Sequence, residues 1–132
     1  MRSDEERLRD IAEAIERIDR YTKAGRHAFD REELIQNWVV HHLQIIGEAA
    51  RRLSEEWKAA HPDIPWRAIV GMRHILVHSY FEIDLDVVWS TVKNNLPQLK
   101  TVVIDSLNDA ADTAASDDDP TEDQDRGSQP HN

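Results

Sequence analysis

Four side chains with acid–base or phosphate-binding chemistry lie close together near the middle of the chain. They are Arg73, His74, His78 and Tyr80, and the residues between them are mostly apolar. This pattern predicts a helix that packs on a core and also presents polar groups. At about 100° per residue, Arg73 and Tyr80 would lie within about 20° of each other, and the two histidines would form an adjacent stripe.

These residue types have an ordinary structural explanation and a metal-binding one. A single Arg or His on a helix is usually a solvated or interfacial residue, and composition alone leaves that explanation ahead even for four such groups. His74 and His78 have the i, i+4 spacing that places two imidazoles on one metal ion. The chain has Ile75 where a metalloprotease helix has Glu. No other residue has a sequence spacing that would identify it as a third metal ligand. We therefore expect no metal ion and no other cofactor here.

A third interpretation is cleavage of a phosphodiester bond in RNA without a metal. The reaction needs a base for the 2′-hydroxyl, an acid for the leaving oxygen and a cation for the charged phosphorane. Histidine titrates in the right range for proton transfer, and arginine binds phosphate oxygens bidentately. One chain offers one obvious His–Arg pair, whereas a two-fold dimer would place two such pairs in one cleft. This interpretation therefore predicts a homodimer.

The elements that must position these groups are helices. The first runs from a capping-box pattern at Ser3 and Glu6 to a stop at Gly25. The second begins after Asp30 and has a wide apolar face, in which Gly47 marks a position of close packing. The periodic apolar residues of the first helix are Leu8, Ile11, Ile15, Ile18 and Thr22.

Proline and aspartate residues mark the predicted helix ends in the second half of the chain. Pro62 ends the preceding pattern, and Pro65 suits the first turn of the helix that carries Arg73. Asp84 is a predicted cap for the last long helix, which Pro97 should kink or divide. With no convincing strand and no internal repeat, the sequence predicts an all-α fold. We expect an antiparallel bundle of four to five helices.

The charge of the chain is concentrated at its C-terminal end. Of its 16 basic and 26 acidic residues, one basic and nine acidic residues fall within 105–132, so the rest is nearly neutral. We expect a helical bundle domain at 1–109 and a disordered acidic tail at 110–132. The chain has no cysteine, no apolar run near the roughly 20 residues of a membrane span, and a charged N-terminus. These features predict a cytoplasmic protein without membrane contact.

The central motif also resembles a known family. Arg73, four residues, His78, one residue and Tyr80 match the R-x4-H-x-Y motif of HepT-like toxins, which belong to the HEPN superfamily of helical ribonucleases. Three flanking blocks resemble the family in the expected order: LQIIGEAARRLS, PDIPWRAIVGMR and YFEIDLDVVW. The resemblance covers about residues 5–105 and leaves the tail outside.

The resemblance implies a role for each residue of the motif. Arg73 and His78 correspond to the catalytic pair of a metal-independent RNA endonuclease, which would act on tRNA or mRNA across a dimer cleft. Tyr80 corresponds to the tyrosine that a cognate minimal nucleotidyltransferase antitoxin adenylylates in a type VII toxin–antitoxin system. His74 stands where the family often has Asn, so it either takes part in proton transfer or orients Arg73.

Two other functions remain open on the sequence. The chain could be a non-catalytic HEPN adaptor that docks on a nucleotidyltransferase and helps bind its substrate, or a plain helical dimerisation module. The intact Arg73, His78 and Tyr80 favour the ribonuclease over the adaptor. The nearly neutral body and acidic tail count mildly against tight general binding of RNA.

Overall fold

A computed structural model describes the backbone of residues 3–78 and 84–128 and the side chains of residues 3–74 and 84–114. Within the described backbone the chain is helical and has no strand, so the predicted all-α bundle is confirmed. The helices are α1 (Asp4–Thr22), α2 (Arg26–Arg31), α3 (Glu33–Arg52), α4 (Glu55–Ala59), α5 (Trp66–His78), α6 (Leu85–Ser90) and α7 (Leu96–Ser128), with a π-helical segment, η1 (Thr91–Asn95), between the last two.

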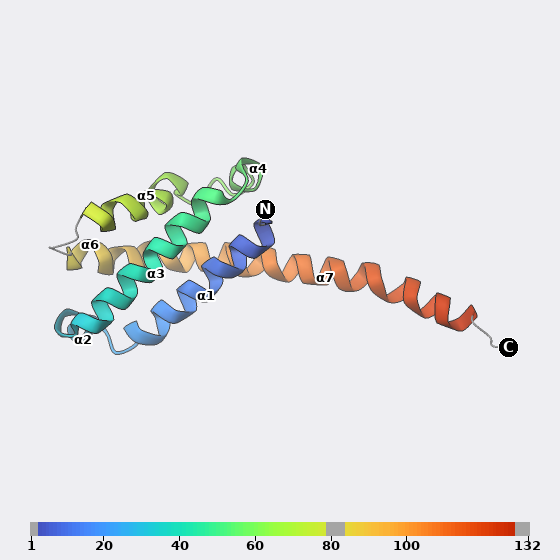
Figure 1. Ribbon diagram of the computed structural model, residues 1–132, viewed down its shortest axis with the longest axis horizontal. Helices are drawn as coiled ribbons and strands as arrows, with labels where there is room; N and C mark the ends of the chain where they lie inside the picture. The colour runs from blue at the N-terminus through green and yellow to red at the C-terminus, as the bar shows by residue number, and fades with distance from the viewer. Residues whose placement is uncertain (1–2, 79–83, 129–132) are drawn as a thin grey trace.

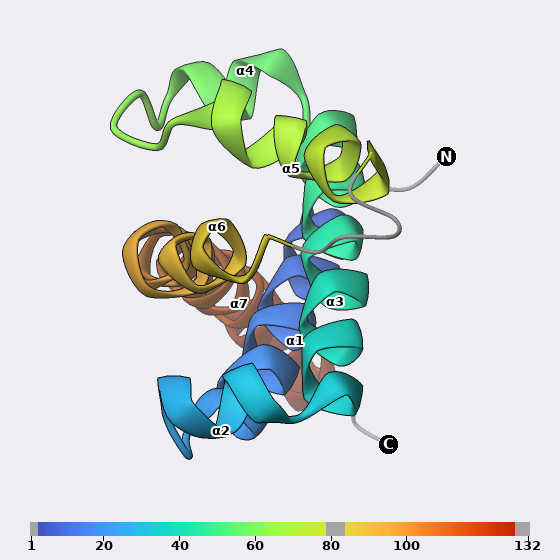
Figure 2. The same cartoon turned by 90° about the vertical axis from the view of Figure 1, so that its left-hand side faces the viewer.

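The long helices pack around one core. Helices α1 and α3 lie side by side, run in opposite directions and share the most extensive contact of the described chain (Figure 1). Helix α5 packs on α3, and α7 packs on α1 (Figure 2). Because α6, η1 and α7 follow one another without a break, the described part of the chain forms four long helical rods and the short helices α2 and α4.

Several helix ends follow the predicted local chemistry. The hydroxyl of Ser3 accepts a hydrogen bond from the N–H of Glu6, and the Glu6 carboxylate accepts one from the N–H of Ser3, which completes the capping box. The side chain of Asp84 accepts a hydrogen bond from Val87 N–H and caps α6. Gly25 follows α1 with a φ of 96°, a conformation that glycine adopts without strain.

The start of the second long helix differs from the prediction. Asp30 lies inside α2, and α3 begins three residues later at Glu33. The Gln36 side-chain amide donates hydrogen bonds to the carbonyls of Phe29 and Asp30 at 3.0 and 3.1 Å, which holds the corner between the helices. Phe29 is fully buried in the core, so tertiary packing fixes this short helix.

The predicted disturbance at Pro97 takes the form of a π-helical turn. Pro97 has no N–H, and its ring would clash with the carbonyl of the residue four positions earlier in a regular helix. The helix widens just before it, and Leu96 N–H donates to the carbonyl of Thr91, five residues back. The wider turn therefore accommodates the proline within a continuous rod.

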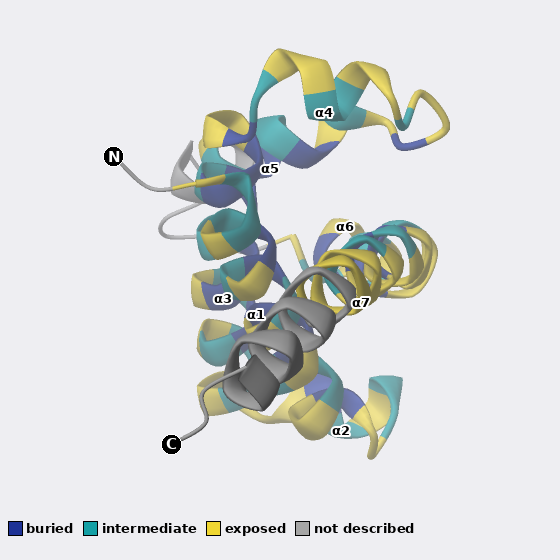
Figure 3. Cartoon of the chain, turned by 90° about the vertical axis from the view of Figure 1, so that its right-hand side faces the viewer, coloured by how far each residue is buried: buried dark blue, intermediate teal, exposed yellow. Residues whose placement is uncertain are grey.

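The core is formed by the facing sides of the long helices. Figure 3 shows the buried residues on the inner sides of α1, α3 and α7. The largest fully buried side chains include Ile11, Ile15, Ile18, Leu43, Ile46, Ile69, Leu96 and Leu99. The apolar residues predicted to line one face of α1 are therefore buried, and its four aliphatic side chains belong to this core.

The C-terminal segment differs from the predicted disordered tail, because α7 is helical as far as Ser128 and projects beyond the bundle (Figure 1). Ala110, Ala111 and Ala114 favour helix locally. Leu107 still packs on the core, whereas residues 108–114 are exposed. The division of the chain at 109/110 stays a prediction. Within the described residues, no helix combines the length and the apolar character that a membrane crossing requires.

Candidate active site

Close contact between α3 and α5 places Arg73 beside the C-terminal part of α3. A Cβ atom at Gly47 would lie 3.1 Å from the backbone nitrogen of Arg73 and 3.3 Å from the carbonyl oxygen of Ile69. These distances are too short for an unstrained side chain, so glycine lets the two backbones approach. The close packing predicted at Gly47 is confirmed, and its effect is to bring Arg73 next to Glu48.

Arg73 is held by two side chains. Its Nη1 donates to Oε1 of Glu48 at 2.7 Å, and its Nη2 lies 3.2 Å from Nε2 of His74. Because a guanidinium only donates hydrogen bonds, His74 accepts at Nε2, and its neutral ring then carries its proton on Nδ1. The Nε atom of Arg73 is buried and has no hydrogen-bond partner among the side chains that the structure describes. The guanidinium is therefore oriented from two sides, and about a third of the side chain remains exposed.

Three arginines share the carboxylate of Glu48. Arg51 donates to it at 3.0 Å, Arg52 at 2.6 Å and Arg73 at 2.7 Å. Hydrogen bonds from Arg51 and Arg52, with a smaller contribution from Arg73, lower the pKa of Glu48 to about 2. Glu48 is therefore a carboxylate throughout the physiological pH range, and it fixes Arg73 with an ionic hydrogen bond.

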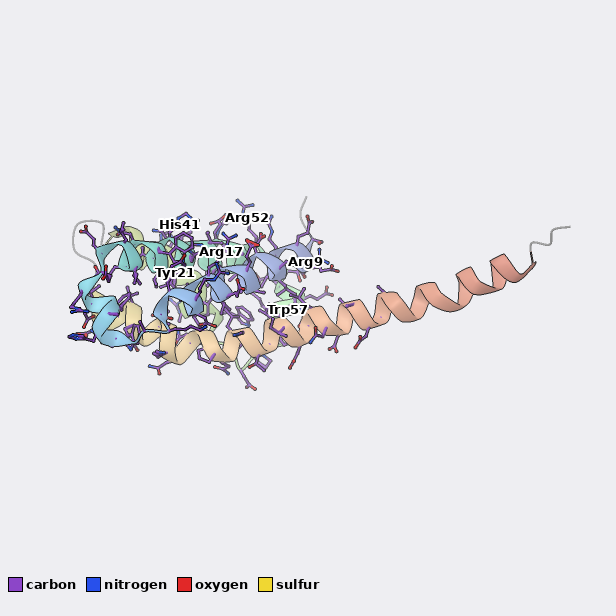
Figure 4. The ribbon with its side chains drawn as sticks, turned by 90° about the horizontal axis from the view of Figure 1, so that it is seen from below. Arg9, Arg17, Tyr21, His41, Arg52 and Trp57 are labelled. Atoms are coloured by element: carbon purple, nitrogen blue, oxygen red, sulfur yellow. The ribbon has the colours of Figure 1, made fainter. Side chains whose placement is uncertain are left out.

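A cavity of about 420 Å³ opens beside Arg73. It is bounded by Arg7 and Asp10 of α1, by His41, Gln44, Ile45, Glu48 and Ala49 of α3, and by Arg73 of α5. In Figure 4, His41 and Arg52 lie over α3 on the side of the bundle turned away from α7. A phosphate group that enters this cavity would meet positively charged donors from two different helices.

The structure brings together part of the predicted site. Arg73 and His74 are in contact, and His78 is the last residue of α5, one helical turn after His74. The side chain of His78 and the whole of Tyr80 lie outside the described residues. Among the side chains that the structure describes, no three His, Asp or Glu residues are grouped in a way that could hold a metal ion.

Three residues of this site were not singled out from the sequence. Glu48, Arg7 and His41 stand far from the motif along the chain, and only the crossing of α1, α3 and α5 brings them to Arg73. The single sequence signal for Glu48 was its place in the first flanking block, directly after Gly47. Arg7 and His41 carried no signal that distinguishes them from other surface residues.

Comparison with known proteins identifies the family. The model of the family described as "Ribonuclease HepT-like" matches residues 11–105. The chain belongs to the HepT-like ribonuclease family. The match extends from α1 into the first part of α7, and it contains the α3–α5 crossing and the whole R-x4-H-x-Y motif. The family resemblance predicted from the motif is therefore confirmed.

Curated HepT-like relatives agree with this assignment. The chain is 43% identical over 100 residues to "Probable ribonuclease HepT" from Thermococcus cleftensis, which is 75% of this chain and 91% of the relative. It is 36% identical over 97 residues to a "Putative RNase" from Methanocaldococcus jannaschii, which is 73% of this chain and 89% of that relative. No solved structure gives a significant match.

Proposed function

We propose that this HepT-like chain is a metal-independent RNA endonuclease that acts in the cytoplasm as the toxin of a toxin–antitoxin pair. The proposal is carried by one observation, the Arg73 guanidinium that Glu48 and His74 orient at the edge of a cavity. An oriented guanidinium matches two phosphate oxygens at once, which a lysine ammonium does not. The names of the ribonuclease relatives support RNA as the substrate.

In the proposed reaction the 2′-oxygen of a ribose attacks the adjacent phosphorus, and the bond to the 5′-oxygen breaks. A base removes the proton of the 2′-hydroxyl, and an acid gives a proton to the departing 5′-oxygen. His78 from each chain of a homodimer would supply these two roles, and Arg73 would bind the charged phosphorane. The products are a 2′,3′-cyclic phosphate and a free 5′-hydroxyl.

The contact between Arg73 and His74 supports a positioning role for His74. An imidazole that accepts a hydrogen bond from Arg73 at Nε2 holds the guanidinium in place. The same nitrogen cannot act as a base for the 2′-hydroxyl while it accepts that hydrogen bond. We therefore assign proton transfer to His78 and orientation of Arg73 to His74.

Tyr80 is the proposed control point. A minimal nucleotidyltransferase antitoxin would join the phenol oxygen of Tyr80 to the α-phosphorus of ATP and release pyrophosphate. Tyr80 follows His78 by two residues in the sequence, so the added AMP would bring bulk and negative charge close to the proposed catalytic histidine, and it would exclude and repel the phosphates of RNA. Tyr80→Phe, which keeps the ring and removes the hydroxyl, should escape this modification and keep cleavage activity.

The direct test is incubation of the purified, unmodified protein with total RNA and tRNA in EDTA. Cleavage should persist, and its products should carry 2′,3′-cyclic phosphate ends. Arg73→Ala and His78→Ala should each abolish cleavage and growth inhibition while the helical circular dichroism spectrum is unchanged. Activity that disappears in EDTA and returns with a divalent ion would refute the metal-independent mechanism. If both variants remain toxic, the ribonuclease assignment fails.

A further inference from the structure

Arg7 has an unusual position on α1. Its Nε atom is buried without a hydrogen-bond partner, and its guanidinium makes no hydrogen bond or ion pair with any residue that the structure describes. Among the described residues, Arg73 is the other side chain with a buried, unpartnered nitrogen. Both arginines border the same cavity. Buried donors are nearly always paired in folded proteins, so a shared ligand would account for both.

The other walls of the cavity suit a nucleoside. Its lining includes Ile45 and Ala49, which are apolar, and its volume of about 420 Å³ falls in the range of small-molecule sites. The exposed His41 ring lies edge-on to the buried His42 ring, with centroids 5.1 Å apart. The amide of Gln44 has no hydrogen-bond partner among the described residues, so both its donor and its acceptor are available.

The carboxylates that border the cavity do not neutralise all of the positive charge around it, so an anion could bind there. Glu48 is already shared by three arginines, so its charge is more than compensated within the cluster. Asp10 has an interaction of its own. Within the described part of the chain, Arg7 is therefore a cation without a carboxylate in direct contact, and phosphate is the group that a guanidinium binds with matching geometry.

We propose that this cavity binds one nucleotide of single-stranded RNA next to the phosphate held by Arg73. Arg7 binds the neighbouring phosphate through its terminal nitrogens, His41 stacks on the base, and Gln44 contacts the edge of the base. The inference rests on the proposed ribonuclease function and adds a substrate-binding subsite to it. A base enters such a cavity only when it is unpaired, so the subsite selects single-stranded regions over duplexes.

The test compares Arg7→Gln with Arg9→Gln in the full-length protein. Both changes remove one positive charge from α1, on which Figure 4 labels Arg9. Arg9 is exposed, pairs with Glu5 and does not line the cavity. The probe is a fluorescent 2′-O-methyl oligonucleotide, which lacks the 2′-hydroxyl that cleavage needs. Arg7→Gln should weaken binding about tenfold and reduce the salt dependence of log K by about 0.7, the value for one phosphate contact with a single strand. Arg9→Gln should stay within about twofold of wild type.

A second pair of variants tests the contact with the base. His41→Ala removes an exposed ring of the cavity, and His27→Ala removes an exposed ring on α2. Only His41→Ala should weaken binding of the oligonucleotide, by about five- to tenfold for one lost stacking contact. The two variants should bind an abasic oligonucleotide of the same length with equal affinity. Equal behaviour of the two variants would contradict stacking on His41.

The outcomes separate this inference from the proposed function. If wild type cleaves RNA but Arg7→Gln matches Arg9→Gln in affinity and salt dependence, the subsite is refuted and the endonuclease stands. If wild type binds the probe through Arg7 yet cleaves no RNA, the subsite stands and the endonuclease is refuted. For a ribonuclease with this subsite, Arg7→Gln should raise KM while kcat changes less than about threefold, because Arg7 binds a flanking phosphate. Failure of wild type to bind the probe would overturn the subsite.

Discussion

The two ends of α3 present opposite kinds of surface. At its N-terminal end Leu34 is 83% exposed, and it borders a shallow apolar hollow with Tyr21, Ile35 and Trp38. At its C-terminal end Glu48 is tied to three arginines, and Gly47 lets the backbone of α5 approach closely.

This contrast has a mechanical consequence. At the C-terminal end Arg73 is held by Glu48 and His74, so a change in either of these side chains should shift the guanidinium. At the N-terminal end the Leu34 side chain is largely exposed, so a change at this residue should be tolerated. The following substitutions test this difference, beginning with the largest expected effect.

Replacement of Arg73 should have the largest effect on cleavage. Arg73→Ala removes the proposed phosphate ligand, and RNA cleavage should fall about 100- to 1,000-fold or more. Arg73→Lys should fail similarly, because one ammonium cannot contact Glu48, His74 and phosphate in the same geometry. Arg52→Ala is the matched control, since Arg52 also contacts Glu48 but does not border the cavity. Its cleavage rate, measured in parallel, should stay within a few-fold of wild type.

Gly47→Ala should disturb both the fold and the site. The new methyl group would meet backbone atoms of α5 at 3.1 and 3.3 Å, and backbone cannot move aside as a flexible side chain can. We expect a loss of about 1–3 kcal/mol in the free energy of unfolding, together with reduced cleavage. Gly71→Ala is the control, because a Cβ at Gly71 meets nothing within 4 Å.

The control should change stability in the opposite direction. Gly71 lies inside α5, where alanine favours the helix by up to about 1 kcal/mol. Urea denaturation of both variants gives the comparison directly. Equal stability of Gly47→Ala and Gly71→Ala would show that α3 and α5 are not in tight contact at this crossing.

Glu48→Gln should show a moderate effect that depends on pH. The pKa of Glu48 is about 2 in the folded chain, below its ordinary value of 4.5, so its ionised form is stabilised by folding. That stabilisation is present above pH 4.5 and is lost as the pH falls towards 2. Because Glu48 and its arginines are partly exposed, solvent screens them, and we expect a difference of about 1 kcal/mol or less at pH 7.

The measurement is the free energy of unfolding of wild type and Glu48→Gln from pH 7 to pH 2. The two curves should converge at the acid end. Glu56→Gln removes an exposed carboxylate of α4 that has no arginine partner among the described residues. The difference in the free energy of unfolding between this variant and wild type should therefore change less with pH. Cleavage by Glu48→Gln should fall about tenfold, because Arg73 loses the group that orients it. A gap between the curves that widens towards pH 2 would contradict the assigned role of Glu48.

Leu34→Ser should have the smallest effect. The Leu34 side chain is largely exposed, so its loss should change the free energy of unfolding by less than about 0.5 kcal/mol. The predicted dimer is built on the helix that carries Arg73, at the other end of α3, so sedimentation should be unchanged. A shift to monomer would place the interface between chains at the apolar end instead.

Local signals in the sequence were sufficient for much of the fold. The capping box at Ser3, the cap at Asp84 and the turn at Gly25 depend on neighbouring residues, and the structure has all three. The disturbance at Pro97 was predicted because it follows from the chemistry of proline. Short helices were harder: α2 and α4 are held by buried or partly buried aromatic side chains, Phe29 and Trp57, and such packing is not visible in a local pattern.

The site was predictable only in part. Arg73 and His74 lie in one motif, and their adjacency along the chain made their contact foreseeable. The pair of Arg73 with Glu48 joins residues 25 positions apart and depends on how closely α3 and α5 cross. Gly47 marked a close approach, but the sequence did not say which helix would occupy it. Arg7 is a candidate because its guanidinium has no partner among the described residues and borders the same cavity as Arg73, and neither property can be read from the sequence.

The π-helical turn before Pro97 sets the rotational register of the rod formed by α6 and α7. Val88, Val92 and Leu96 are spaced by four residues and all are buried. In a regular helix a spacing of four drifts by about 40° at each step, so a wider turn keeps the three side chains on one line. Deletion of one residue within 91–95 would therefore rotate α6 by about 100° against α7 and turn Val88 towards solvent. A change in the length of this segment would therefore rotate the whole N-terminal end of the rod, which follows α5 in the sequence.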